Sequence, residues 1–179
     1  MSKKPAKRVI TPAQRRRSAA RLAAVQVLYQ IDMSGASADE VLRDVLQRGG
    51  MAVAAAAAVA DEDGREPPET MIEPDGELLT FLVRETLDER ERFDEVIGAS
   101  LSRDWPAERL EAVLRAILRA GACEMIRRPA VPPRVVISEW VDVAHAFYAG
   151  HEPGMVNAVL DRIARVVRPE EMGGENGRP

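Results

Sequence analysis

The sequence is poor in cysteine, histidine and aromatic residues. Its 179 residues include one cysteine, Cys123, and two histidines, and only 4% are aromatic. A single cysteine excludes an internal disulfide framework and a multi-cysteine zinc site, and it fits a reducing compartment. No run of about 18 apolar residues is present, which argues against a membrane span, and the basic N-terminus lacks the apolar stretch of a secretory signal. We therefore expect one cytoplasmic domain whose core is built from Ala, Leu, Val and Ile.

The residues that carry catalysis, metal binding or nucleotide binding occur in no recognisable pattern. His145 and His151 lie six residues apart across a glycine, whereas a metal pair on one helix needs a spacing of three or four. Cys123 has an arginine one turn away on each side but no pairing histidine, so we interpret it as a packed core thiol. No GxxxxGK[ST] or GxGxxG loop is present. We expect no catalytic residue, cofactor or metal.

Hydrophobic spacing and capping signals predict an all-α fold of about seven helices. Thr11, Pro12 and Gln14 form a capping box with proline at the first helical position, and Ser34 with Gly35 ends this first helix. Apolar residues at helical spacing predict further helices that begin near residues 37, 76, 88, 104, 136 and 155. No segment predicts a sheet, so the helices should pack on one another as a bundle.

The domain organisation follows from composition. We expect a basic, disordered arm at 1–11, a single helical domain at 12–168 and a disordered tail at 169–179. Within the domain, 51–76 begins with alanine and valine and continues as an acidic stretch with several prolines and glycines. We interpret 51–76 as an insertion that is partly helical and then disordered.

The net charge of −4 hides an asymmetry along the chain. Residues 1–31 contain eight basic residues and no acid, so this segment carries +8 and the remainder −12. The eight are Lys3, Lys4, Lys7, Arg8, Arg15, Arg16, Arg17 and Arg21. Arginine offers forked donors to phosphate oxygens and stacks on unpaired bases, and a helix N-terminus also favours anions. The pattern favours nucleic-acid binding through one face, and a basic tail that docks on an acidic protein stays open as the alternative.

Four segments together form a more specific pattern. They are the arginine-rich start of the first helix with AVQVLY at 24–29, LEAVLRAILR at 110–119, the stretch 132–147, and MVNAVLD at 155–161. In this order they resemble the NusB family of bacterial transcription antitermination factors. The resemblance covers roughly 12–48 and 76–168.

The resemblance implies an all-α fold of two packed helical subdomains and a function without catalytic chemistry. It implies binding to the boxA RNA of ribosomal RNA leaders together with the small-subunit ribosomal protein that acts as NusE. The complex would join RNA polymerase, with other Nus factors, and suppress premature termination.

The resemblance also implies roles for individual positions. Arg15, Arg16, Arg17 and Arg21 would contact RNA, with weaker support for Lys3, Lys4, Lys7 and Arg8. Met155 stands where the family usually has Phe and would supply an apolar RNA contact. Tyr29 would lie at or near the interface with the ribosomal protein.

Two other interpretations stay open at this point. The first is a NusB-like adaptor that binds proteins without sequence-specific RNA binding. The second is an enzyme module, because the helical fold also resembles the N-terminal domain of an rRNA cytosine methyltransferase. That enzyme needs a following SAM-binding domain and the sequence stops at Pro179, so we favour the RNA-binding factor.

Overall fold

All regular structure in the described part of the chain is helical. The computed structural model describes residues 10–47, 72–102 and 105–173. The elements are α1 (Pro12–Ser34), α2 (Ala38–Gln47), α4 (Gly76–Asp88), α5 (Arg90–Ser100), the 3-10 helix η1 (Ala107–Arg109), α6 (Ala112–Arg127), α7 (Pro133–Phe147), α8 (Glu152–Val167) and α9 (Pro169–Met172). The predicted all-α fold is confirmed. Most of the predicted insertion at 51–76 lies outside the described residues.

The first helix begins and ends where the sequence predicts. The Thr11 hydroxyl accepts a hydrogen bond from the Gln14 backbone N–H at 3.2 Å, and the Gln14 side chain accepts one from the Thr11 N–H at 2.9 Å. The helix ends at Gly35, whose φ of +68° is in the left-handed region that glycine adopts without a steric penalty. These caps define a helix of 23 residues, the longest in the described ranges.

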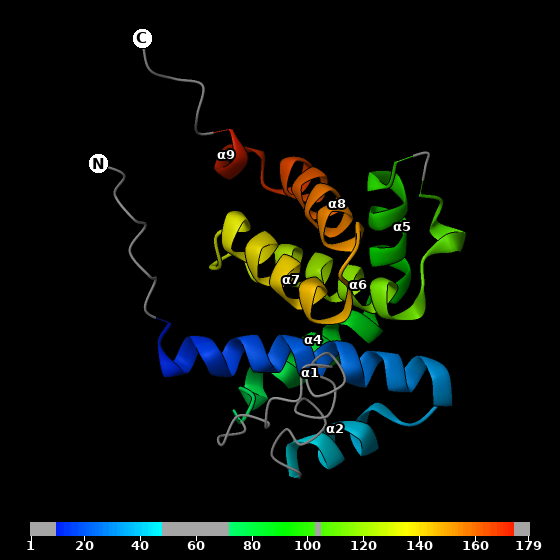
Figure 1. Ribbon diagram of the computed structural model, residues 1–179, viewed down its shortest axis with the longest axis vertical. Helices are drawn as coiled ribbons and strands as arrows, with labels where there is room; N and C mark the ends of the chain where they lie inside the picture. The colour runs from blue at the N-terminus through cyan, green and yellow to red at the C-terminus, as the bar shows by residue number, and fades with distance from the viewer. Residues whose placement is uncertain (1–9, 48–71, 103–104, 174–179) are drawn as a thin grey trace.

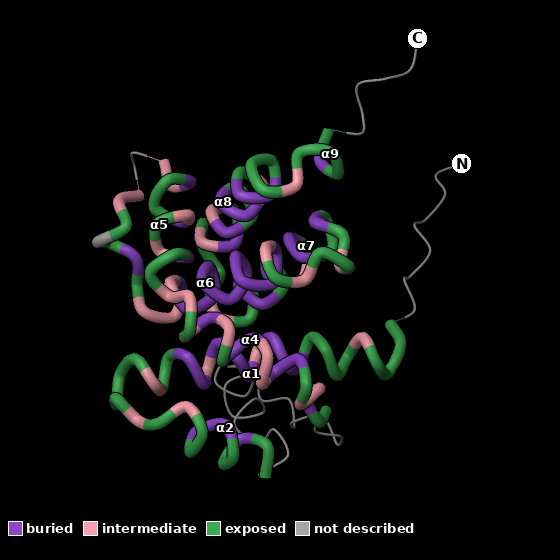
Figure 2. Tube along the Cα trace, turned by 180° about the vertical axis from the view of Figure 1, so that it is seen from behind, coloured by how far each residue is buried: buried purple, intermediate pink, exposed green. Residues whose placement is uncertain are grey.

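The helices form two groups that share α1 and α6. α1 packs against α2 and α4 on one side and against α6 and α7 on the other, while α8 packs mainly on α6 and α7. In Figure 1, α1 crosses the molecule between α2 and the α5–α8 group. Burial is concentrated where these groups meet, as Figure 2 shows. The middle of α1, from Ala19 to Leu28, is thereby held in the core, while its beginning extends past the core.

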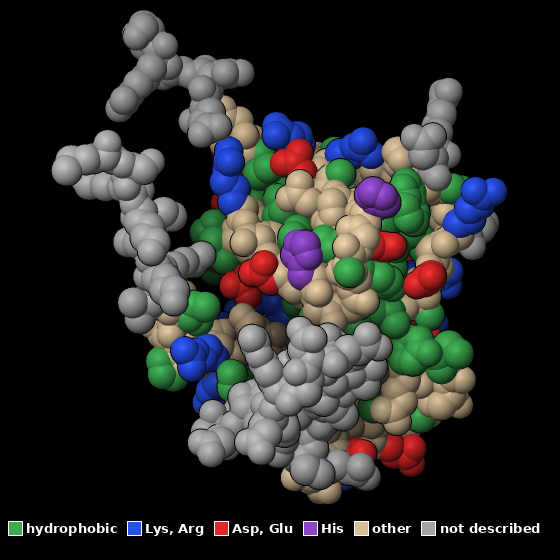
Figure 3. Space-filling model, in the orientation of Figure 1, with side chains coloured by type: hydrophobic (Ala, Val, Ile, Leu, Met, Phe, Trp, Pro, Cys, Tyr) green, Lys and Arg blue, Asp and Glu red, His purple; other side chains and the backbone are tan. Residues whose placement is uncertain are grey.

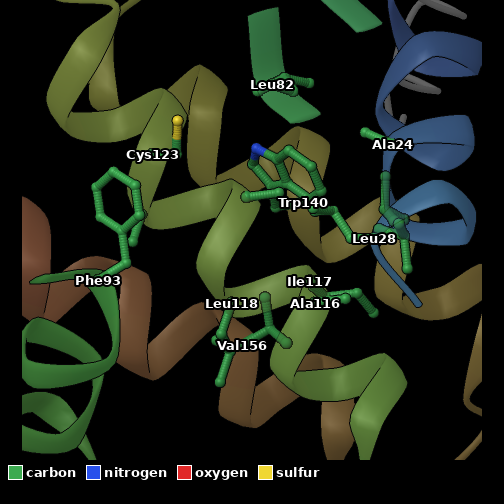
Figure 4. Packing of buried hydrophobic residues seen from close by; sticks show 14 of the residues in the cluster. Ala24, Leu28, Leu82, Phe93, Ala116, Ile117, Leu118, Cys123, Trp140 and Val156 are labelled. Carbon is green, nitrogen blue, oxygen red and sulfur yellow. The ribbon is translucent and has the colours of Figure 1, made fainter. Parts of the chain in front are cut away.

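Small residues let the core helices approach closely around a buried tryptophan. Trp140 of α7 is fully buried and lies between α6 and the Ala24 and Leu28 face of α1 (Figure 4). A Cβ added at Gly121 would lie 3.1 Å from both Cδ atoms of Leu160 and 3.3 Å from Cγ of Trp140. Gly121 is therefore a point of close helix approach.

Two predicted boundaries are wrong. The helix expected from residue 104 begins only at Ala112, because Pro106 starts a separate 3-10 turn and Leu110 has an extended backbone. The tail expected to be disordered from 169 contains α9, since Met172 is buried and Arg168 binds the carbonyl oxygens of Pro129 and Val131 at 2.7 Å each. These contacts join residues that are far apart in sequence.

Candidate nucleic-acid interface

The beginning of α1 projects from the body of the protein. Residues 11–18 are exposed apart from the half-buried Gln14, and continuous burial begins only at Ala19. The exposed segment therefore spans about two turns of helix. Figure 3 shows basic side chains over this end of α1. Arg15, Arg16 and Arg17 lie on it, so all three are accessible to a large ligand.

No acidic side chain among the described residues pairs with these three arginines. Within the described ranges none of them forms an ion pair, and their two side-chain hydrogen bonds are long: Arg16 Nε to the Glu73 carbonyl and Arg17 Nε to the Ala13 carbonyl, both at 3.4 Å. Successive residues on a helix are about 100° apart, so the three guanidinium groups are distributed around the helix. A nucleic-acid backbone that curves around the end of α1 can therefore contact all three guanidinium groups more readily than a straight backbone can.

The helix N-terminus itself contributes few donors. A helix N-terminus usually favours anions through unpaired backbone N–H groups, but here Pro12 has none and the capping box occupies that of Gln14. The Arg15 N–H already donates to the Thr11 carbonyl at 3.0 Å. The arginine side chains, rather than the backbone, are the donors that this end of α1 offers.

Arg21 does not fit the predicted role of an RNA ligand. Its side chain is 5% exposed, and its Nε and Nη2 donate to the two carboxylate oxygens of Glu124 at 2.8 Å each. Its Nη1 donates to Glu139 at 2.8 Å. Every nitrogen of the guanidinium is therefore bonded within the protein, and we remove Arg21 from the candidate RNA surface.

Glu124 is the centre of this buried network. It is fully buried and accepts two further hydrogen bonds, from Trp140 Nε1 at 2.8 Å and Arg128 Nη1 at 3.1 Å. Burial alone would lower the pKa of Arg21, but the hydrogen bond and charge of Glu124, with the charge of Glu139, raise it overall, so the guanidinium stays charged. The network fixes α1 to α6 and α7 directly behind the projecting arginines.

Glu124 and Glu139 hold Arg21 in place and were not predicted from the sequence as site residues. Glu124 is an acid within an almost continuously buried stretch of α6, and an isolated acid on a buried face requires a partner. That signal was available in the sequence. The identity of its partner could not be predicted from the sequence, because Arg21 is 103 residues away.

Glu139 also accepts a hydrogen bond from α1 at the point where the projecting segment meets the body of the protein. Its Oε2 accepts a hydrogen bond from the Ser18 hydroxyl at 2.9 Å in addition to that from Arg21. One carboxylate of α7 therefore holds two successive turns of α1. The exposed turns before Ser18 extend from this fixed point.

The structure does not bring Met155 next to the arginines. Met155 lies in the first turn of α8, is half-buried and packs against the core. In Figure 1 the first turn of α8 and the first turns of α1 lie apart. The two predicted RNA contacts therefore belong to separate places on the surface, and the basic residues Lys3, Lys4, Lys7 and Arg8 lie outside the described residues.

Tyr29 is on the surface of α1 rather than in the core. It is 39% exposed, and Met33, one turn later, is 65% exposed. Tyr29 is 12 residues beyond Arg17, which corresponds to about 18 Å along the helix axis. The exposed side chains of Tyr29 and Met33 thus lie toward one end of α1, and the exposed arginines lie toward the other.

The described residues offer no alternative metal site, and Cys123 among them is buried. No group of three His, Cys, Asp or Glu side chains within them could hold a metal ion. The interpretation of Cys123 as a packed core thiol is confirmed, since the side chain is fully buried in the core, and this burial raises its pKa to about 12. Among these residues, no helix is both long and apolar enough to cross a membrane.

Comparison with known proteins agrees with the helical fold. Residues 18–165 match the sequence profile of the NusB family. The chain belongs to the NusB family. The transcription antitermination protein NusB of Rhodospirillum rubrum is 55% identical over 166 residues, covering 89% of this chain and 88% of the relative. That of Granulibacter bethesdensis is 42% identical and covers 90% and 94%.

Solved NusB structures share the architecture. NusB of T. maritima superimposes with a TM-score of 0.65 at 23% identity, covering 92% of this chain and 99% of that one, which shows a common fold. A crystal structure of the antitermination factors NusB and NusE with double-stranded RNA has a TM-score of 0.62 at 26% identity and covers 85% and 98%. The family assignment expected from the four sequence segments is confirmed.

Proposed function

We propose that this NusB-family protein binds a boxA-like single strand of ribosomal RNA leaders together with the NusE ribosomal protein. In this role it acts in the cytoplasm, without a catalytic step of its own, on elongating RNA polymerase with other Nus factors. The observation that carries the proposal is the projecting end of α1, where Arg15, Arg16 and Arg17 have no acidic partner among the described residues. The related structure that contains NusB, NusE and RNA supports the choice of partners.

The separation of charge favours RNA at one end of the molecule. The sequence after residue 31 carries a net charge of −12, so most of the protein repels a polyanion. Three exposed arginines on a projection attract it, because release of counterions from the RNA favours such contacts. The exposed Tyr29, about 18 Å from Arg17 along α1, and Met33 one turn further leave room for a protein partner beside the bound strand.

A direct binding measurement tests the RNA assignment. Fluorescence anisotropy with a labelled boxA-like single strand and a scrambled strand of equal composition, across a salt series, should give tighter binding of the boxA-like strand at every salt concentration. The logarithm of the affinity should fall linearly with the logarithm of the salt concentration, by about 0.7 per phosphate contact. Equal affinity for both strands would instead favour the adaptor without sequence-specific RNA binding.

The assignment of NusE as partner makes a separate prediction. Saturating NusE should tighten RNA binding by about tenfold through positive coupling, and Tyr29→Ala should weaken NusE binding by about tenfold because it removes a central aromatic side chain from the interface. Val166→Ala is the matched control, since Val166 is 78% exposed at the far end of α8. Calorimetry that finds the same RNA affinity with and without NusE, or equal effects of the two variants, would contradict this part.

A further inference from the structure

A cavity lies beside the projecting arginines and is not used by the proposed backbone contacts. It has a volume of about 580 Å³ and lies between Arg16 on α1, Leu46 near the end of α2, and residues 73–77 at the start of α4. Ligand pockets in proteins usually measure about 300–1,000 Å³. The cavity is therefore large enough for one nucleobase with its ribose.

The walls of the cavity are held in place by backbone and packing contacts. The Asp75 N–H donates to the Arg16 carbonyl at 3.0 Å, and the Asp75 carboxylate caps α4 by accepting from the Leu78 N–H at 3.1 Å. A Cβ added at Gly76 would lie 3.2 Å from Cδ2 of Leu46, so α2 and α4 already approach closely there. The segment that carries Glu73 and Glu77 is thus fixed relative to α1.

Two carboxylates at the cavity have no partner within the described residues. Glu73 and Glu77 both line it and are exposed, and neither side chain accepts a hydrogen bond or forms an ion pair there. Leu46 and the buried Pro74 supply an apolar wall. Free acceptors on an apolar wall are suited to the edge of a flat ring that carries N–H donors.

The charge of the cavity selects the part of an RNA that enters it. The carboxylates of Glu73, Asp75 and Glu77 repel a phosphate group, whereas Arg16 at the rim attracts one. A strand whose backbone lies on the arginines would therefore direct a base, not a phosphate, into the cavity. Sequence-specific recognition of single-stranded RNA uses unstacked bases in this way, read along their Watson–Crick edges.

Among the four bases, guanine fits the acceptors best. Its Watson–Crick edge presents two adjacent donors, N1–H and the N2 amino group, which match the two oxygens of one carboxylate. Adenine, cytosine and uracil each present a single donor group on this edge. We propose that the cavity at Glu73 and Glu77 is a subsite for an unstacked guanine of the bound RNA. The inference rests on the proposed RNA contact of Arg15–Arg17.

Three uridine 12-mers test this subsite: one with a single central guanosine, one with inosine at that position, and one of uridine only. Because each strand is short, it can bind the arginines in different registers, and the guanine can therefore reach the cavity. Wild-type protein should bind the guanosine strand about tenfold more tightly than the uridine strand, the size expected of one bidentate base contact. The inosine strand, which lacks the N2 amino group, should fall between them.

Matched variants identify the groups that read the base. Glu73→Gln and Glu77→Gln are made singly, and at least one should abolish the preference for guanosine while uridine binding stays the same or improves. Glu40→Gln removes an exposed acid on α2 that does not line the cavity, and it should keep the preference. Circular dichroism confirms that each variant is folded. A preference that persists in both cavity variants overturns the subsite.

The outcomes separate this inference from the proposed function. If wild-type protein binds all three strands equally and Arg15→Gln, Arg16→Gln and Arg17→Gln together weaken all three, the RNA surface is correct and the guanine subsite is wrong. If wild-type protein binds none of the strands and no boxA-like strand, the proposed function itself fails.

Discussion

Replacing Glu124 by alanine is expected to lower the free energy of unfolding by about 3–5 kcal/mol, because breaking a buried ion pair leaves an uncompensated charge. The change removes the acceptor of four hydrogen bonds, from Arg21, Arg128 and Trp140. The Arg21 guanidinium would then keep only its bond to Glu139. Urea denaturation followed by circular dichroism measures the change in stability.

An exposed ion pair provides the control for this prediction. Asp161 pairs with Arg165 at 2.7 Å on the surface of α8, and Asp161→Ala should change stability little, because solvent screens such pairs. A double-mutant cycle with Arg21→Ala and Glu124→Ala should give a large coupling energy. Equal effects of Glu124→Ala and Asp161→Ala, or additive effects in the cycle, would show that the network does not hold α1.

Neutralising the projecting arginines is expected to weaken RNA binding by about 10- to 100-fold near 0.1 M salt, since each phosphate contact of a single strand adds about 0.7 to the salt slope. The variant carries Arg15→Gln, Arg16→Gln and Arg17→Gln, which keep a strong helix former at each position. Because these side chains can no longer neutralise three phosphates, the slope should flatten by about 2. Anisotropy over a salt series measures both quantities.

A control variant with the same change in net charge tests whether RNA affinity depends on the position of the arginines or on the total charge of the protein. Arg84, Arg92 and Arg165 are exposed and already pair with Asp39, Glu89 and Asp161. Their simultaneous replacement by glutamine should leave the salt slope unchanged. If both triple variants lose the same affinity, binding reflects overall charge and the end of α1 is not the contact surface.

The burial of Arg21 changes how the basic segment of α1 works. Four arginines within seven residues form one charge cluster in the sequence, but the structure divides them. Three lie on the projection, and the fourth pairs with Glu124 and Glu139 and holds that projection on the body. A partner bound at Tyr29 and a strand bound at Arg17 would then lie on one helix that this network keeps fixed.

The sequence by itself determined the helices, the family and the charged end of α1. Capping residues, hydrophobic spacing and the four family segments are local signals, so Thr11 and Gly35 could be interpreted correctly without coordinates. Boundaries failed where long-range contacts outweigh local preference, as in α9, which Met172 and Arg168 hold against the body.

The tertiary structure alone decided which charged residues are available. Arg17 and Arg21 have the same chemistry and nearly the same sequence context, yet one is exposed and the other is fully bonded. The difference depends on Glu124 and Glu139, more than 100 residues further along the chain. The cavity beside Arg16 likewise exists only because α1, α2 and α4 meet there. Such pairings depend on how helices pack, which periodicity within one helix does not encode.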